Sequence, residues 1–376
     1  MRVQEIILEN NSRRYLLVDS NGLPVLPVMR YLKFLDTTGK SSNTQKTYCY
    51  ALKQYFMFLK QMDLDHTIIK LNHLVDFVGW LRNPLEGGTV TSLHPIVSRK
   101  TESTINLTLT AVMGFYDYLY RNEEMDKAME DLLVKQVFTG GRKYKDFLYH
   151  INKGKPSNRN ILKLKKKRRK VKVLRKEQVE QLIQATNNIR DRLLILVLFE
   201  TGLRIGELLS LFLEDFISDH KNGHRIRLVD RGELENGAKL KTGEREIFVS
   251  RELMDLFDDY LYEVVDELDI HTNFVFVKMR GSKIGRAMNY QDASSLFNRL
   301  SKKTGINVHP HLLRHTHATM FYKQTGDIKQ VQERLGHSLI QTTMDLYLHP
   351  SSEDIRESWE KVQHAFNINI KGKPGE

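Results

Sequence analysis

Cationic side chains and one tyrosine stand at short spacings in the second half of the chain. His311 and Arg314 are three residues apart, which places both on one face of a helix. Arg204 lies in the glycine-punctuated segment TGLRIGEL, and Tyr347 follows His337 by ten residues. Fixed guanidiniums can hold the charge that gathers on a phosphodiester under attack, and a phenol can form a phosphate ester. These residue types suit phosphoryl transfer, although each spacing alone is a weak signal.

Other kinds of phosphoryl-transfer chemistry are poorly supported. The sequence has no glycine-rich phosphate loop and no carboxylates spaced for Mg²⁺, which argues against ATP-driven and two-metal mechanisms. The histidines His309, His311, His315 and His317 could suggest a metal site. Because no cysteine or carboxylate lies near them in sequence, we expect neither a metal nor another cofactor.

Each chemical assignment has a structural alternative. Arg204 could pair with Glu207 on a helix surface, since such an (i, i+3) contact contributes about 0.2–0.5 kcal/mol. Tyr347 alone would be taken for a core tyrosine, and Tyr290 and Tyr322 would be equal candidates for a nucleophile. Only the order of the motifs along the chain separates these interpretations.

In combination and in this order, the segments resemble the tyrosine recombinase (phage integrase) family. The matching motifs are TGLRIGEL, HPHLLRHTHAT, RLGHS and TTMDLY. The helical first half and the basic stretch after it are similar to the family's core-binding domain and interdomain linker. The N-terminal extension and overall layout resemble transposon-encoded integrases of the transposase A type.

The resemblance implies a catalytic role for six residues. Matched motif by motif, they are Arg204, Lys241, His311, Arg314, His337 and the nucleophile Tyr347. Lys241 is preferred over Lys239 because Lys-Thr-Gly is the turn sequence of many members. The two arginines would bind the phosphate, and His337 would hydrogen-bond it. His311 would act as general base, and Lys241 would protonate the leaving 5′-hydroxyl. Tyr347 would become a 3′-phosphotyrosine, which conserves the bond energy without ATP.

Hydrophobic periodicity predicts a helical first half. A helix begins at Leu26, and further helical patterns cover residues 45–62, 71–82, 100–121 and 126–134. Two short strands are expected within residues 3–17. The aromatic residues on the helical stripes are expected to be core residues rather than base-stacking platforms, because their spacing matches burial.

The second half is predicted to be mainly helical with a small sheet. Helices are expected at residues 176–185, 191–200, 204–213, 252–263 and over most of 290–364, with breaks at Gly305, Gly326 and Gly336. A hairpin is expected to join residues 225–229 to 246–250, and residues 274–277 could add a third strand. The fold class implied by the resemblance is mainly α, with a SAM-like core-binding domain and an α+β catalytic domain that carries a small antiparallel sheet.

The positive charge of the chain is concentrated in one segment. The 376 residues include 58 Lys and Arg against 46 Asp and Glu, a formal net charge of +12. Residues 153–176, here called the basic segment, hold 13 Lys or Arg and no acidic residue. Such a run is either a solvated tether or a strap across nucleic-acid phosphates, and its place between two domains favours the strap.

Five parts of the chain follow from these observations. They are an N-terminal extension at residues 1–25, a core-binding domain at 26–150, a basic linker at 151–175, a catalytic domain with a C-terminal helix at 176–366 and a tail at 367–376. The C-terminal helix at residues 352–366 could pack on a neighbouring protomer or on its own domain. The single cysteine, Cys49, excludes a disulfide framework. Because no apolar run is long enough to span a bilayer, we expect a cytoplasmic protein without a membrane partner.

The resemblance implies a site-specific DNA recombinase that integrates or excises a mobile element. The resemblance implies double-stranded DNA as partner, a homotetramer on DNA and, in some systems, accessory recombination proteins. Two alternatives stay open. A type IB topoisomerase would use the same kinds of active-site residue, and a non-catalytic DNA-binding regulator would need the basic segment but not Tyr347.

Overall fold

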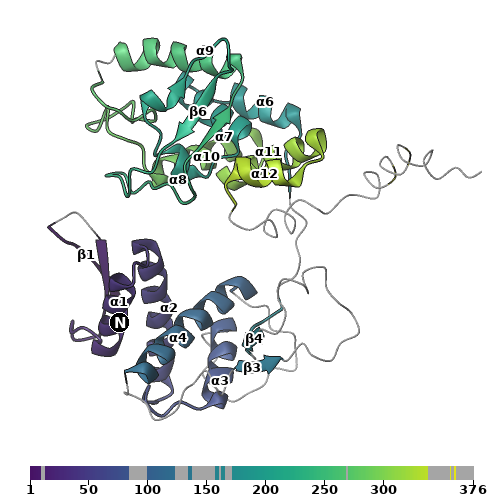
Figure 1. The fold of residues 1–376 in the computed structure, drawn as a ribbon. Coiled ribbons are helices and arrows are strands. Elements are labelled where there is room, and N and C mark those ends of the chain that lie inside the picture. Colours follow the sequence, from purple (N-terminus) through teal and green to yellow (C-terminus); the bar gives the residue numbers. More distant parts are fainter. Residues whose placement is uncertain are drawn as a thin grey trace, which may run out of the picture. The chain divides into compact units, whose positions relative to one another are not determined.

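The computed structural model describes residues 1–9, 13–83, 100–122, 134–137, 157–160, 162–165, 172–267 and 270–337, together with residues 356 and 360. The chain forms two compact units, Met1–Arg168 and Arg169–Glu376, here called the first and second unit (Figure 1). No helix in these described ranges is long and apolar enough to cross a membrane.

The first unit contains helices and two small hairpins. Its elements are β1 (Arg2–Ile7), β2 (Arg13–Val18), α1 (Leu26–Thr37), α2 (Ser42–Gln61), α3 (Leu71–Arg82), α4 (Glu102–Arg121), β3 (Val134–Val137) and β4 (Ser157–Asn160). β1 pairs with β2, and β3 with β4, both antiparallel. The strands expected within residues 3–17 and the helix expected at 71–82 are confirmed. Of the helix expected at 126–134, residues 126–133 lie outside the described residues, and Val134 begins β3 instead.

Aromatic side chains fill the core of the first unit. Tyr55, Phe77, Phe115 and Tyr116 are fully buried, and neighbouring rings meet at centroid distances of 4.9 to 5.9 Å. The hydroxyl oxygens of Tyr55 and Tyr116 are 2.6 Å apart, and Tyr116 donates to the carbonyl of His66. Burial therefore leaves neither phenol without a partner. The prediction that these stripes are core residues is confirmed.

The second unit surrounds one buried helix. Its elements are α6 (Lys176–Gln184), α7 (Ile189–Thr201), α8 (Ile205–Leu208), a 3₁₀ turn (Leu213–Asp215), β5 (Phe216–Ile217), β6 (Arg225–Leu228), β7 (Arg245–Phe248), α9 (Arg251–Tyr260), a π-helical turn (Leu261–Asp266), α10 (Tyr290–Thr304), α11 (Pro310–Thr325) and α12 (Ile328–Leu335). In α7 only Arg192 is exposed, and α9 and α11 pack against this helix. The antiparallel sheet has the order β5-β6-β7, so the expected hairpin is present.

Two expectations for the second unit are wrong. Residues 274–277 do not form the third strand, which is β5 instead; Phe274 makes only an isolated bridge to Phe212. The helix expected at 204–213 stops at Leu208. Its continuation fails because the carbonyl of Leu209 accepts from the side chain of Asn236, and because the hydroxyl of Ser210 bonds back to the carbonyl of Glu207.

Left-handed glycines end four helices of the second unit. Gly202, Gly305, Gly326 and Gly336 cap α7, α10, α11 and α12 with φ between 63° and 72°. Side chains rarely adopt this conformation, so glycine is the default residue there. The breaks expected at Gly305, Gly326 and Gly336 are thus confirmed.

Gly202 and Gly305 form a matched pair for a stability test. An added Cβ at Gly305 would meet nothing within 4 Å, whereas at Gly202 it would lie 2.6 Å from Cδ2 of His317. We expect Gly305→Ala to lower the free energy of unfolding by about 1 kcal/mol through backbone strain alone. Gly202→Ala should lower it by about 2–4 kcal/mol, because overpacking adds to that strain. Urea unfolding of both variants measures the difference, and equal losses would contradict the packing argument.

Candidate active site

Arg204 lies at the start of α8 and turns part of its guanidinium to solvent. The left-handed Gly202 ends α7, and Arg204 becomes the N-cap residue of α8. Its Nη1 donates to Oε1 of Glu207 at 2.9 Å and to the carbonyl of Leu335 at 3.4 Å. Nε and Nη2 make no hydrogen bond to any described residue, and the side chain is 23% exposed. This open edge can donate to two oxygens of a phosphate.

Glu207 is the buried counter-ion of the site. Its side chain has no exposed surface, yet it meets Nη1 of Arg204, Nη2 of Arg245 at 3.2 Å and the hydroxyl of Thr242 at 2.9 Å. Nη1 of Arg314 lies 4.0 Å away. Burial alone would raise the pKa of Glu207, but Arg245, Arg204 and Arg314 together hold it below its ordinary value. The expected contact between Arg204 and Glu207 exists, but in the protein interior rather than on a helix surface.

Arg314 joins the ends of three helices. It is 3% exposed on α11, and its Nη1 donates to the carbonyl of Gly202 at 2.7 Å. Its Nη2 donates to the carbonyl of Leu335 at 2.9 Å and lies 2.9 Å from Nε2 of His337. Burial and the nearby arginines lower the pKa of His337 to about 4. A neutral His337 can accept this hydrogen bond, so Arg314 and His337 are held together at neutral pH.

His311 lies in the first turn of α11, next to the same cations. Partial burial and then Arg314, His309, Arg204 and Lys241 lower its pKa, because each positive charge opposes a further one. His311 is therefore neutral near pH 7. A neutral imidazole can accept a proton, as a general base requires.

Lys241 lies in the long loop between β6 and β7. The next residue, Thr242, donates to Glu207, and the buried Leu240 fixes the loop on its other side. Lys241 is the last of the cations that lower the pKa of His311, after burial and the charges of Arg314, His309 and Arg204. Lys239, on the other side of Leu240, is also exposed, so the choice of Lys241 as the lysine of the site stays a prediction.

Some predicted features lie outside the described residues. These are Tyr347, residues 153–156, 161 and 166–171 of the basic segment, and most of the expected C-terminal helix. Of that helix only Arg356 and Glu360 are described, and they form an ion pair of 3.2 Å. Of the competing tyrosines, Tyr290 is 63% exposed at the start of α10. Tyr322 packs against a small cluster of Ala318, Val331 and Leu335. Tyr322 is partly buried there.

The remaining histidines near the site have structural partners. Nδ1 of His317 lies 2.9 Å from the carbonyl of Phe199, and its Nε2 accepts from Nε of Arg334 at 3.1 Å. Nδ1 of His309 accepts from the backbone of Leu312 and so caps α11. Within the described ranges, no group of three or more His, Cys, Asp or Glu residues is placed to hold a metal ion.

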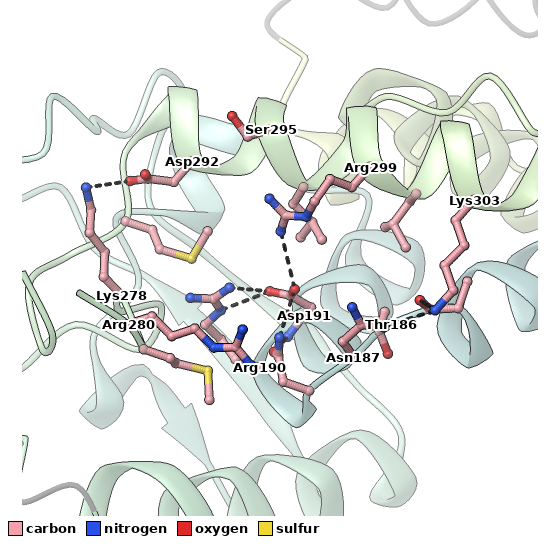
Figure 2. A pocket seen from close by; sticks show the side chains of 16 residues that line it. Thr186, Asn187, Arg190, Asp191, Lys278, Arg280, Asp292, Ser295, Arg299 and Lys303 are labelled. Carbon is pink, nitrogen blue, oxygen red and sulfur yellow. Dashed lines mark hydrogen bonds and ion pairs between the residues drawn. The ribbon is translucent and has the colours of Figure 1, made fainter.

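A separate pocket of about 560 Å³ lies between the start of α7 and α10 (Figure 2). Its lining does not include any of the six predicted catalytic residues. Asp191 meets Arg190 at 2.5 Å and Arg299 at 3.8 Å, and Lys278 meets Asp292 at 3.1 Å. These ion pairs satisfy much of the charge in the pocket.

Glu207, Thr242 and Arg245 were not among the predicted site residues, although they connect the others. One signal for Glu207 was present: a carboxylate in the otherwise apolar stretch from Ile205 to Leu209 requires a cationic partner if that stretch is buried. Nothing in the sequence indicates that Arg245 and Thr242 contact this carboxylate, because both contacts depend on how the β6–β7 loop folds back.

Two family models and a set of relatives match the chain. The model of the phage integrase family covers residues 172–354, and that of the phage integrase N-terminal SAM-like domain covers residues 28–123. Transposase A of transposon Tn554 from Staphylococcus aureus is 41% identical over 364 residues, 96% of this chain and 98% of that protein. The chain belongs to the phage integrase family. All six predicted catalytic positions fall within the span of the first model.

Other phage integrase relatives agree in fold. The tyrosine recombinase XerA of Pyrococcus horikoshii is 31% identical over 89% of this chain and 92% of its own length. Among solved structures, XerH bound to its difH substrate has a TM-score of 0.59 at 17% identity over 91% of this chain and 96% of that chain. The Tn1549 integrase in complex with transposon right end DNA has a TM-score of 0.59 at 20% identity. The match covers 90% of this chain and 99% of that chain. The expected fold class is confirmed.

Acid should destabilise the second unit through its neutral histidines. Burial and neighbouring cations lower the pKa of His315 and His337 to about 4 and that of His317 to about 3. An unfolded histidine binds its proton near pH 6.5, so below that pH the unfolded state holds more protons. Stability is therefore complete above about pH 6.5 and falls as the pH drops to about 4.

Urea titrations across this pH range measure the effect. The slope of the free energy of unfolding against pH reports the difference in bound protons between the unfolded and folded states. His317→Gln should reduce that difference by about one proton, because it removes one histidine with a lowered pKa. Ile284→Val, a change at an exposed side chain that does not titrate, serves as the control and should leave the dependence unchanged. An unchanged slope in His317→Gln would contradict the assignment of His317 as a buried neutral group.

Proposed function

We propose that this protein is a site-specific DNA recombinase that cleaves and rejoins DNA through a 3′-phosphotyrosyl intermediate and so integrates or excises a mobile element. The observation that carries the proposal is the open edge of Arg204, beside Arg314 and the neutral His311, in a member of the phage integrase family. The name of the Tn554 relative, a transposase, supports a mobile element as substrate.

The proposed cleavage step uses each group for one task. The phenolic oxygen of Tyr347 attacks the scissile phosphorus and passes its proton to His311. Arg204 and Arg314 hold the non-bridging oxygens, where negative charge accumulates, and His337 hydrogen-bonds the same phosphate. The bond from phosphorus to the 5′-oxygen breaks, and that oxygen takes a proton from Lys241. Rejoining is the reverse, with a 5′-hydroxyl displacing the phenol.

Both units would contact DNA. We propose residues 26–150 as core-binding domain, residues 176–366 as catalytic domain and the basic segment as a strap across phosphates. The exposed face of α2 supports the core-binding role, because its cations Lys46 and Lys60 can meet DNA phosphates. Tyr50 and Met57 are exposed between them. Strand exchange would take place in a homotetramer in the cytoplasm, on nucleoid DNA, with accessory recombination proteins where the element requires them.

A nicked suicide substrate tests the reaction. After cleavage the short 5′-terminated strand diffuses away, so the covalent 3′ adduct accumulates and survives SDS. We expect the wild-type protein to form this adduct and Tyr347→Phe to reduce it by at least about 1000-fold, because the nucleophilic oxygen is absent. An adduct of normal yield with the Phe variant would mean that another residue is the nucleophile.

Companion measurements separate the alternative functions. Arg204→Ala should bind DNA nearly normally in band shifts but lose cleavage, since its open edge faces the phosphate rather than the core. A topoisomerase would relax a plasmid that carries no site pair, whereas a recombinase needs two sites. A DNA-binding regulator would form no adduct at all.

The salt dependence of DNA binding tests the strap. If the basic segment contacts about six phosphates, log K should fall with log salt at a slope near −5. Replacing the six cations at residues 165–170 by glutamine should flatten this slope, while the adduct yield at saturating DNA stays near that of the wild type. An unchanged slope in fluorescence anisotropy titrations would show that these cations do not contact DNA.

A further inference from the structure

Arg245 is the first residue of β7, and all three nitrogens of its guanidinium donate hydrogen bonds within the protein. Nε donates to the carbonyl of Arg334 at 3.1 Å, and Nη1 donates to the hydroxyl of Thr242 at 2.8 Å and to the carbonyl of Gly243 at 3.5 Å. Nη2 donates to Glu207 at 3.2 Å and to the carbonyl of Leu335 at 3.4 Å. All five N–H donors of the group thus have acceptors. Unlike Arg204, Arg245 has no open edge for a phosphate.

These contacts connect two parts of the site that are far apart in sequence. Thr242, which accepts from Arg245, directly follows Lys241 and also donates to Glu207. The carbonyls of Arg334 and Leu335 form the end of α12, two residues before His337. Arg245 therefore bridges the lysine loop on one side and the helix end that leads to His337 on the other.

Gly336 shows how closely this bridge is packed. An added Cβ there would lie 2.7 Å from Oγ1 of Thr242 and 2.8 Å from Nη1 of Arg245. Real Cβ atoms do not approach so closely, so the helix end and the bridge leave no room between them. Arg245 itself is 12% exposed. The lysine loop can thus move away from the end of α12 only by breaking several hydrogen bonds.

We propose that Arg245 is a positioning residue that, through Thr242 and Glu207, holds Lys241 where the leaving 5′-oxygen must be protonated. The inference rests on the proposed function. During cleavage the P–O5′ bond breaks, and the departing oxygen receives a proton from Nζ of Lys241. A lysine displaced by about 1 Å would deliver that proton poorly, and such misplacement can reduce a rate by about 100-fold.

A sulfur substitution isolates this step. In DNA with a bridging 5′-phosphorothiolate, the P–S5′ bond breaks and sulfur leaves as a thiolate, which is far more stable than an alkoxide and needs no proton from Lys241. Single-turnover cleavage of the oxygen and sulfur suicide substrates is measured with Arg245→Gln and with Thr242→Val. Thr242→Val keeps the side-chain shape and so tests the bridge even if Arg245→Gln fails to fold.

We expect both variants to cleave the oxygen substrate about 100-fold more slowly than wild type and the sulfur substrate within about threefold of it. Lys241→Ala should show the same rescue, and Arg204→Ala should show none, because it affects the phosphate rather than the leaving group. Arg251→Gln, at an exposed arginine of α9 paired with Asp255, is the matched control and should match wild type on both.

Three outcomes would overturn the proposal. Normal cleavage of the oxygen substrate by both variants would mean that the bridge does not position the lysine. Equal defects on oxygen and sulfur substrates would place the role of Arg245 in phosphate binding or in the fold. If wild type forms no adduct with either substrate, the proposed function itself fails and the inference falls with it. Either of the first two outcomes, obtained with an active wild-type protein, overturns the inference alone.

Discussion

A single carboxylate without exposed surface, Glu207, holds the cationic site together. Arg204, Arg245 and Arg314 would repel one another in the low-dielectric interior, and an isolated buried carboxylate would be equally unfavourable. In the structure the negative charge of Glu207 offsets the positive charges of the three arginines. The hydroxyl of Thr242 donates a further hydrogen bond to the carboxylate. An anion beneath the arginines therefore allows the protein to present a cationic surface to a phosphate.

The three arginines around Glu207 differ in how many donors the protein itself uses. Every side-chain N–H of Arg245 donates a hydrogen bond within the protein. Both terminal nitrogens of Arg314 do so. In Arg204, Nη1 is the only side-chain nitrogen that donates to a described residue. All three donate to the carbonyl of Leu335, at the negative end of the α12 dipole. The same chemical group thus serves as a structural bridge at one position and as a ligand-binding group at another.

Local signals in the sequence predicted the parts that depend on local physics. Helix periodicity located α3, and glycine located the ends of α10, α11 and α12, because a left-handed cap has few alternatives. The same local reasoning gave wrong predictions where contacts between distant residues determine the structure. Asn236 ends α8 early from outside that helix, and Phe274 pairs with the irregular backbone at Phe212 rather than with a strand.

For the candidate site, motif order identified residues of the right chemical type, and the structure brings Arg204, Arg314 and His337 together. The sequence could not reveal that Glu207 is buried or that the β6–β7 loop returns to it through Thr242 and Arg245. Such contacts join residues that are 35 and 38 positions apart, and no local pattern records them.

The shared carbonyl of Leu335 has a consequence for how substitutions combine. Because Arg204, Arg245 and Arg314 all donate to this one oxygen, removing one of them changes the hydrogen bonds that are left to the other two. Residues in one hydrogen-bond network show interaction energies of about 0.5–3 kcal/mol. The effects of substitutions at these three arginines on stability are therefore non-additive, and a double variant reports the coupling of the site rather than the sum of its parts.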